Sequence, residues 1–147
     1  MSSEEVRNKL RSEYKMIADF LGWHYVPFNA NENLRHTAGW HKPISIDEDG
    51  APVLFVGSKN PGFITRKTLD LNFRYNWEML MQVVTFIEEI EDNKHGGFKV
   101  IIDSDCCTIQ SKLKTKETSY SRTYCSKGDK RKAIYESILA FINFYKS

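Results

Sequence analysis

Residues 98–113, FKVIIDSDCCTIQSKL, decide the fold of this chain. The segment opens with the short β-branched run Phe98–Ile102, which predicts a strand. Asp103-Ser104-Asp105 has the composition of a turn and not of a pair of catalytic carboxylates. Two further strands are predicted at Cys106–Leu113 and Tyr120–Cys125, where they form a hairpin. The sequence therefore predicts a small antiparallel sheet.

Helices are predicted on both sides of these strands. Asn76 can cap a helix that runs from Trp77 to about Glu91. Apolar residues occupy two faces of that helix and leave only a narrow polar stripe, which is typical of a helix in the core. Gly128-Asp129 opens a final helix, whose apolar stripe consists of Ile134, Ile138, Phe141 and Tyr145.

A first helix is predicted over residues 3–21. Ser2 and Glu5 have the spacing of a capping box, and Gly22 is suited to end the helix. Residues 23–42 show no regular pattern. Together the elements predict the α+β class: a small antiparallel sheet packed with about three helices, sandwich-like, in a single domain over residues 1–147.

The middle of the chain, about 43–70, is interpreted as a variable insertion. Ile44–Asp47 and Val53–Val56 can form a short hairpin. Residues 57–62, GSKNPG, have the composition of a loop. They lack the spacing and the closing Gly-Lys-Ser/Thr of a Walker phosphate loop. We therefore expect a turn here and not a nucleotide site.

The composition is that of a globular protein. A chain of 147 residues is long enough to form a core, and its 41% hydrophobic and 27% charged residues are typical of a globular protein. No apolar run reaches the roughly 20 residues that span a bilayer, and the polar start does not resemble a signal peptide. We therefore expect a cytoplasmic protein without a membrane partner. The odd number of cysteines does not suggest a disulfide framework. We expect Cys107 in the core and Cys125 as a buried or bystander thiol.

Three segments carry a resemblance to a known family. They are residues 16–23 (MIADFLGW), 75–84 (YNWEMLMQVV) and 132–145 (KAIYESILAFINFY). Together they resemble small phage and prophage proteins of the phage ABA-sandwich type, which are common in Bacteroidota and their viruses. The resemblance implies a fold and a phage context in a bacterial host cell. It carries no catalytic residues to this chain, so we expect a protein that is not an enzyme.

Positive charge is concentrated in residues 112–132. This segment has eight Lys or Arg and two acidic residues, a local charge of +6, whereas the whole chain is only +2. Alternate residues of a strand share a face. We therefore expect one row of cations, Lys112, Lys114 and Lys116, and one mixed row, Tyr120, Arg122 and Tyr124.

The final helix begins with cations, which the helix dipole disfavours there. Free backbone amides and three cations at one helix start favour an anion. We therefore predict an anion site, with Lys112, Lys114, Arg122, Lys130, Arg131 and Lys132 holding phosphate and Tyr120, Tyr124 or Trp40 stacking on a base. The alternative stays open that these cations form a solvated edge, because lysines also prevent strand edges from pairing.

Three functional hypotheses follow from the sequence. The first is a protein that sequesters a small, anionic, nucleotide-like signal, as phage counter-defence proteins do. Homo-oligomers favour such sequestration because they can close pockets between protomers. The second is an interaction module that inhibits or adapts a host protein. The third, single-stranded nucleic-acid binding, is disfavoured by a net charge of only +2.

No cofactor or metal site is expected. His36 and His41 are separated by a spacing that suits neither a helical pair nor a known zinc motif. Cys125 with His24 or His41 is conceivable as a nucleophile and base, but no local motif supports that pairing.

Overall fold

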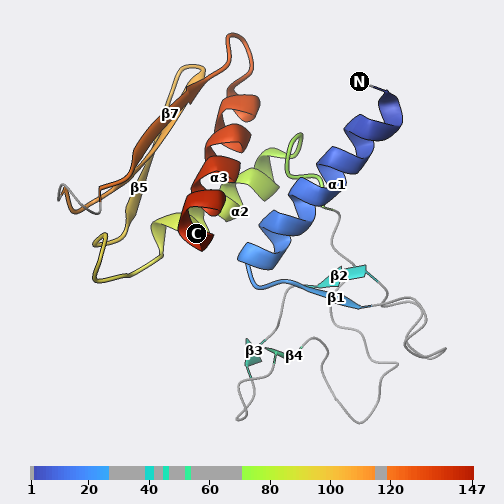
Figure 1. The fold of residues 1–147 in the computed structure, drawn as a ribbon, viewed down its shortest axis with the longest axis horizontal. Helices are drawn as coiled ribbons and strands as arrows, with labels where there is room; N and C mark the ends of the chain where they lie inside the picture. The colour runs from blue at the N-terminus through green and yellow to red at the C-terminus, as the bar shows by residue number, and fades with distance from the viewer. Residues whose placement is uncertain (1, 27–38, 42–44, 47–51, 54–70, 115–118) are drawn as a thin grey trace. The chain divides into compact units, whose positions relative to one another are not determined.

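The computed structural model describes residues 2–26, 39–41, 45–46, 52–53, 71–114 and 119–147 (Figure 1). The chain divides into two compact units, one formed by residues 1–17 with 72–147 and the other by residues 18–71. The described residues contain three helices and a three-stranded antiparallel sheet, so the predicted α+β class is confirmed. The predicted single domain over residues 1–147 stays a prediction.

The helix starts follow the capping chemistry of the sequence. Helix α1 (Ser3–Phe20) begins with a reciprocal capping box: the Glu5 amide donates to Ser2 Oγ at 3.2 Å, and the Ser2 amide donates to Glu5 Oε2 at 3.4 Å. The helix ends at Phe20, and Gly22 follows with a φ of +79°, which suits a residue without a side chain. The capping prediction for α1 is therefore confirmed.

Helices α2 (Trp77–Glu88) and α3 (Lys130–Lys146) are capped as predicted. Asn76 Oδ1 accepts a hydrogen bond from the Met79 amide at 3.1 Å. Asp129 Oδ1 accepts one from the Lys132 amide at 3.0 Å. Each cap satisfies a backbone donor that has no partner inside the helix. Helix α2 ends earlier than the predicted Glu91.

The sheet consists of β5 (Phe98–Asp103), β6 (Cys106–Ser111) and β7 (Ser121–Cys125), in that order and all antiparallel. The observed β6 and β7 are shorter than the predicted strands. The turn between β5 and β6 passes through Ser104, which has a φ of +51°. Asp105 Oδ2 accepts a hydrogen bond from the Gly128 amide at 3.3 Å, so this carboxylate joins the turn to the loop that precedes α3.

The core lies between one face of this sheet and helices α2 and α3 (Figure 1). Helix α3 packs on β6 and β7, and α2 packs on β5. The fully buried side chains include Phe98, Ile109, Ile134, Ile138 and Phe141. Burying each side chain of this size contributes roughly 1.5–3 kcal/mol. The opposite face of the sheet is more polar: Thr108 and Thr123 form a hydrogen bond there at 2.7 Å.

The second unit contains two short antiparallel pairs. Strand β1 (His24–Val26) pairs with β2 (Gly39–His41), and β3 (Ser45–Ile46) pairs with β4 (Pro52–Val53). The prediction that residues 23–42 are irregular is wrong for β1 and β2. The predicted hairpin around residues 44–56 is confirmed where it is described, in β3 and β4. The rest of that hairpin and the loop at 57–62 lie outside the described residues.

Candidate ligand-binding groove

An open groove of about 610 Å³ runs between β7 and α3. Two contacts fix α3 against the sheet. The Tyr120 ring stacks on the Phe144 ring with centroids 4.2 Å apart, and Ser137 Oγ donates to the carbonyl of Cys107 in β6 at 2.9 Å. Side chains from both elements line the space: Arg122, Tyr124, Glu136, Leu139, Ala140, Asn143, Phe144 and Ser147.

Arg122 and Tyr124 lie on the face of β7 that is turned toward α3. In the sheet register they stand opposite Ile109 and Cys107, whose side chains are buried beneath α3. The predicted mixed row of rings and a cation is therefore confirmed. Arg122 is exposed and Tyr124 is half-buried. Among the residues that the structure describes, no carboxylate forms an ion pair with Arg122.

Tyr120 shares this face, but it belongs to the core. Its side chain is only 6% exposed, and the Phe144 ring covers one of its faces. Burial raises the pKa of the Tyr120 hydroxyl to about 12. That hydroxyl has no hydrogen-bond partner within the described part of the chain. These observations argue against the predicted role of Tyr120 in stacking on a base.

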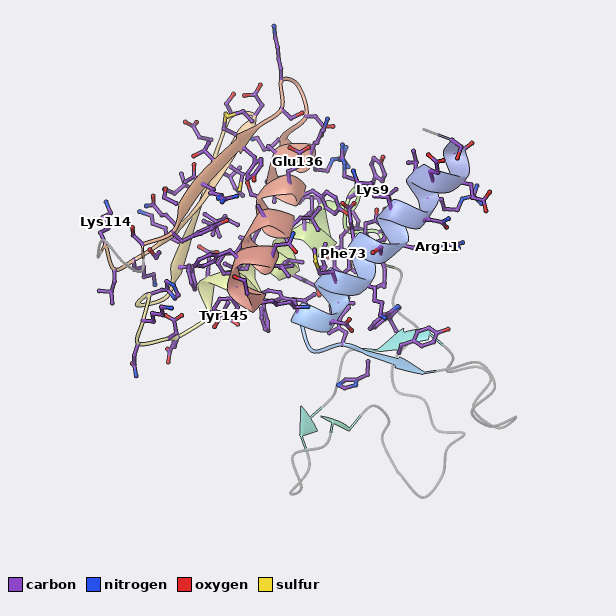
Figure 2. The ribbon with its side chains drawn as sticks, viewed as in Figure 1. Lys9, Arg11, Phe73, Lys114, Glu136 and Tyr145 are labelled. Carbon is purple, nitrogen blue, oxygen red and sulfur yellow. A yellow bond between two sulfur atoms is a disulfide. The ribbon has the colours of Figure 1, made fainter. Side chains whose placement is uncertain are left out.

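Five of the six predicted cations lie beyond the two ends of β7, and the sixth, Arg122, lies within the strand. Lys112 and Lys114 follow β6, whose last residue, Ser111, stands beside Tyr120 at the start of β7. Figure 2 labels Lys114 near this connection and Glu136 on α3. Lys130 and the two cations after it follow the opposite end of β7. A five-residue strand is about 16 Å long, so the six predicted phosphate ligands do not form one cluster. Lys116 lies outside the described residues.

The start of α3 is occupied by contacts within the protein. The Arg74 guanidinium donates to Asp129 Oδ2 at 2.8 Å, and this hydrogen bond is the main reason that the pKa of Asp129 is lowered. The Arg131 guanidinium donates to the Tyr75 carbonyl at 2.7 Å. Asp129 also accepts from the amide of Lys132. The cap therefore supplies the negative charge that a bound anion was expected to bring, which argues against a phosphate site here.

Trp40 belongs to the second unit. Its ring lies 5.6 Å from the Tyr25 ring, across the β1–β2 pair. The sequence offered the two aromatic residues but not their pairing, because residues 27–38 separate the strands in sequence. A role for Trp40 in stacking on a base stays a prediction.

A disulfide joins Cys106 and Cys125, which stand directly opposite each other in β6 and β7. The prediction that Cys125 is a buried or bystander thiol is wrong. The odd cysteine count hid the pair, because only the strand register brings these two sulfur atoms together. Cys107, the remaining free cysteine in the structure, is buried as predicted, and burial raises its thiol pKa.

Metal binding receives no support from the described ranges, which contain no cluster of three or more His, Cys, Asp or Glu side chains suited to a metal ion. His95 is buried instead. Its Nδ1 lies 2.7 Å from Asp92 Oδ2, and its ring packs on Phe98 and Phe144. His36 lies outside the described residues.

None of the described helices is both long enough and apolar enough to cross a membrane. The comparisons found no matching family model, no matching curated protein and no matching solved structure. Because no matching protein suggests a function, the functional proposal is based on the groove and its residues.

Proposed function

We propose that the protein is a non-enzymatic binding protein whose ligand is a small nucleotide-like anion held in the groove between β7 and α3. One observation carries this proposal. The Arg122 guanidinium, which has no ion-pair partner among the described residues, shares an open groove of about 610 Å³ with the ring of Tyr124. That volume lies within the range of small-molecule sites.

Each groove residue has a chemical role in this proposal. Arg122 binds a phosphate through two parallel N–H donors. Tyr124 provides a ring on which a base stacks. Glu136 repels phosphate and accepts hydrogen bonds from amino groups, so it favours the base at its own end of the groove. Lys114, in the connection that leads from β6 to β7, adds a positive field that attracts the anion, whereas the Lys112 side chain lies beside Gly97, ahead of β5.

The resemblance to phage ABA-sandwich proteins suggests the biological setting. In a bacterial host cell, a phage protein that binds a signalling nucleotide without turning it over would remove that signal from the host's defence. Such a protein needs a cation, a ring and no catalytic group. We therefore propose sequestration of the signal in the host cell as the purpose of binding.

A thermal-shift screen against mono-, di- and cyclic nucleotides tests this proposal. A ligand at 100 times its dissociation constant stabilises the fold by roughly 2.7 kcal/mol, which a melting curve detects. A shift that is confined to one nucleotide class supports the proposal. If no nucleotide shifts the melting temperature, the proposal is wrong.

A host protein is the second candidate partner, because two large side chains are exposed at the start of α2. Tyr75 is 56% exposed and Trp77 is 45% exposed. Exposed aromatic residues are enriched at protein interfaces. Pull-down from host lysate with the wild type and with Trp77→Ala separates the two candidates. Capture of one protein that the variant loses, together with a negative nucleotide screen, favours the protein partner.

A further inference from the structure

The outer edge of β7 presents unpaired backbone groups. The Ser111 amide donates to the Tyr120 carbonyl at 2.8 Å, and the Ser126 amide donates to the Asp105 carbonyl at 2.9 Å. Backbone groups alternate in direction along an antiparallel strand. Those of Arg122 and Tyr124 therefore point toward β6, and those of Ser121, Thr123 and Cys125 point away. No other strand pairs with this side of β7 in the described part of the chain.

This edge lacks the features that usually prevent edge pairing, which are outward lysines, prolines and bulges. The only charged residue of β7 is Arg122, and its side chain lies on the face turned toward α3. The other face of the strand carries Ser121, Thr123 and Cys125, all uncharged. Among the residues that the structure describes, nothing pairs with this edge, so it is open there to a further strand.

We propose that two copies of the chain pair through their β7 edges, antiparallel, with Thr123 opposite Thr123 of the second copy. Ser121 then stands opposite Cys125 of the second copy. In this register Ser121, Thr123 and Cys125, whose backbone groups point away from β6, stand opposite the same three residues of the second copy. Every outward-pointing amide therefore meets an outward-pointing carbonyl. The two three-stranded sheets become one continuous sheet.

Side chains are complementary in this register. Arg122 stands opposite Tyr124 of the second copy in a pair without backbone hydrogen bonds, where side chains are closest. A guanidinium on a tyrosine ring forms a favourable cation–π contact. Moving the two-fold axis by one residue toward Arg122 would instead place the two Arg122 side chains opposite each other and Cys125 opposite Ser119, which lies outside β7. The register on Thr123 is therefore favoured.

Glu136 adds charge complementarity. Its neighbour Ser137 donates to the carbonyl of Cys107, and Cys107 is paired with Tyr124. The carboxylate of Glu136 is therefore at the level of Tyr124 in the groove that both line. Because Tyr124 faces Arg122 of the second copy, each Glu136 stands at the level of an opposite charge.

The test of this interface uses Thr123, which lies on the face away from the groove. Thr123→Lys places two lysines opposite each other at the two-fold axis. The matched control is Thr108→Lys on the same face of the central strand. Both variants lose the same 2.7 Å hydrogen bond between the threonines, but Thr108 is half-buried and Thr123 is exposed, so the melting temperature of each variant is measured first to confirm that it folds. Neither residue lines the groove, so a failure of the interface is distinguishable from a failure of nucleotide binding.

Sedimentation velocity without any ligand gives the mass of each protein as concentration is raised. We expect the wild type and Thr108→Lys to reach twice the 17.1 kDa mass of one chain. Thr123→Lys is expected to raise the dimer dissociation constant by about two- to fivefold, because like charges that stand directly opposite each other repel. A wild type that stays monomeric at every concentration overturns the proposal, as does a dimer that both lysine variants weaken equally.

Amide hydrogen exchange locates the interface. As the wild type associates, the amides of Ser121, Thr123 and Cys125 are expected to become protected. Those of Arg122 and Tyr124, which point toward β6, are expected to be protected at every concentration. A dimer in which the Thr123 amide still exchanges rapidly forms through another surface and overturns the proposal.

Discussion

Replacing Cys106 and Cys125 with serine tests the sheet and its register together. The disulfide joins two strands whose cysteines are 19 residues apart in sequence. The substitution removes the cross-link and leaves two small polar side chains on the open face. The predicted effect is a less stable fold with the same secondary structure.

The magnitude follows from the chain entropy of the unfolded state. A cross-link that closes a loop of this length reduces that entropy enough to stabilise the fold by roughly 3 kcal/mol. Cys106 is half-buried and Cys125 is exposed, so packing loss is small beside the entropic effect. For a chain of this size, about 3 kcal/mol corresponds to a fall in melting temperature of roughly 10 °C.

Urea denaturation of the oxidised wild type, the reduced wild type and the double serine variant measures the effect. The reduced wild type and the variant are expected to have the same midpoint, below that of the oxidised protein. Alkylation in denaturant without reductant is expected to modify only Cys107. Alkylation of all three cysteines in the oxidised sample, or equal midpoints in all three proteins, would refute the reasoning.

Two other predictions concern the core and the response to acid. Phe141→Ala removes a fully buried ring that contacts Phe98, so it should lower the free energy of unfolding in urea by about 3–5 kcal/mol. The control Asn143→Ala changes an exposed residue of the same helix and should lower that free energy far less. Equal losses in the two variants would contradict the described core. Burial tends to raise the pKa of Asp92, but hydrogen bonds from His95 and from the Gly97 amide outweigh it and lower that pKa. Asp92 therefore makes its full contribution to stability above the pKa of an unfolded aspartate, and this contribution is lost as the pH falls through the lower pKa of the folded state. Asp92→Asn should flatten the acid side of a plot of unfolding free energy against pH. An unchanged plot would contradict this account.

Local chemistry made the helices predictable. The caps at Ser2, Asn76 and Asp129 depend on side chains within three residues of the amides that they satisfy, so their pattern is visible in the sequence. The strand that begins at Phe98 was predictable because its β-branched residues follow one another directly in the sequence. Strand ends were less so, because the last pairings depend on partners elsewhere in the chain.

The candidate site needed contacts that the sequence does not encode locally. Alternation placed Tyr120, Arg122 and Tyr124 on one face, as the structure confirms. It could not distinguish the ring that α3 covers from the ring that the groove exposes, because the packing of Phe144 decides this. The Cys106–Cys125 pair was hidden by the same dependence on long-range register.

The central claim is that the groove between β7 and α3 binds the ligand. The most direct test is to titrate the nucleotide that shifts the melting temperature into Arg122→Ala and into Lys130→Ala. Both variants remove one exposed cation, but only Arg122 lines the groove. A charge-assisted hydrogen bond contributes about 1.5–3 kcal/mol, so Arg122→Ala should weaken binding by about tenfold or more. Lys130→Ala should bind like the wild type. Equal affinity of Arg122→Ala and the wild type would contradict the claim that this groove binds the ligand.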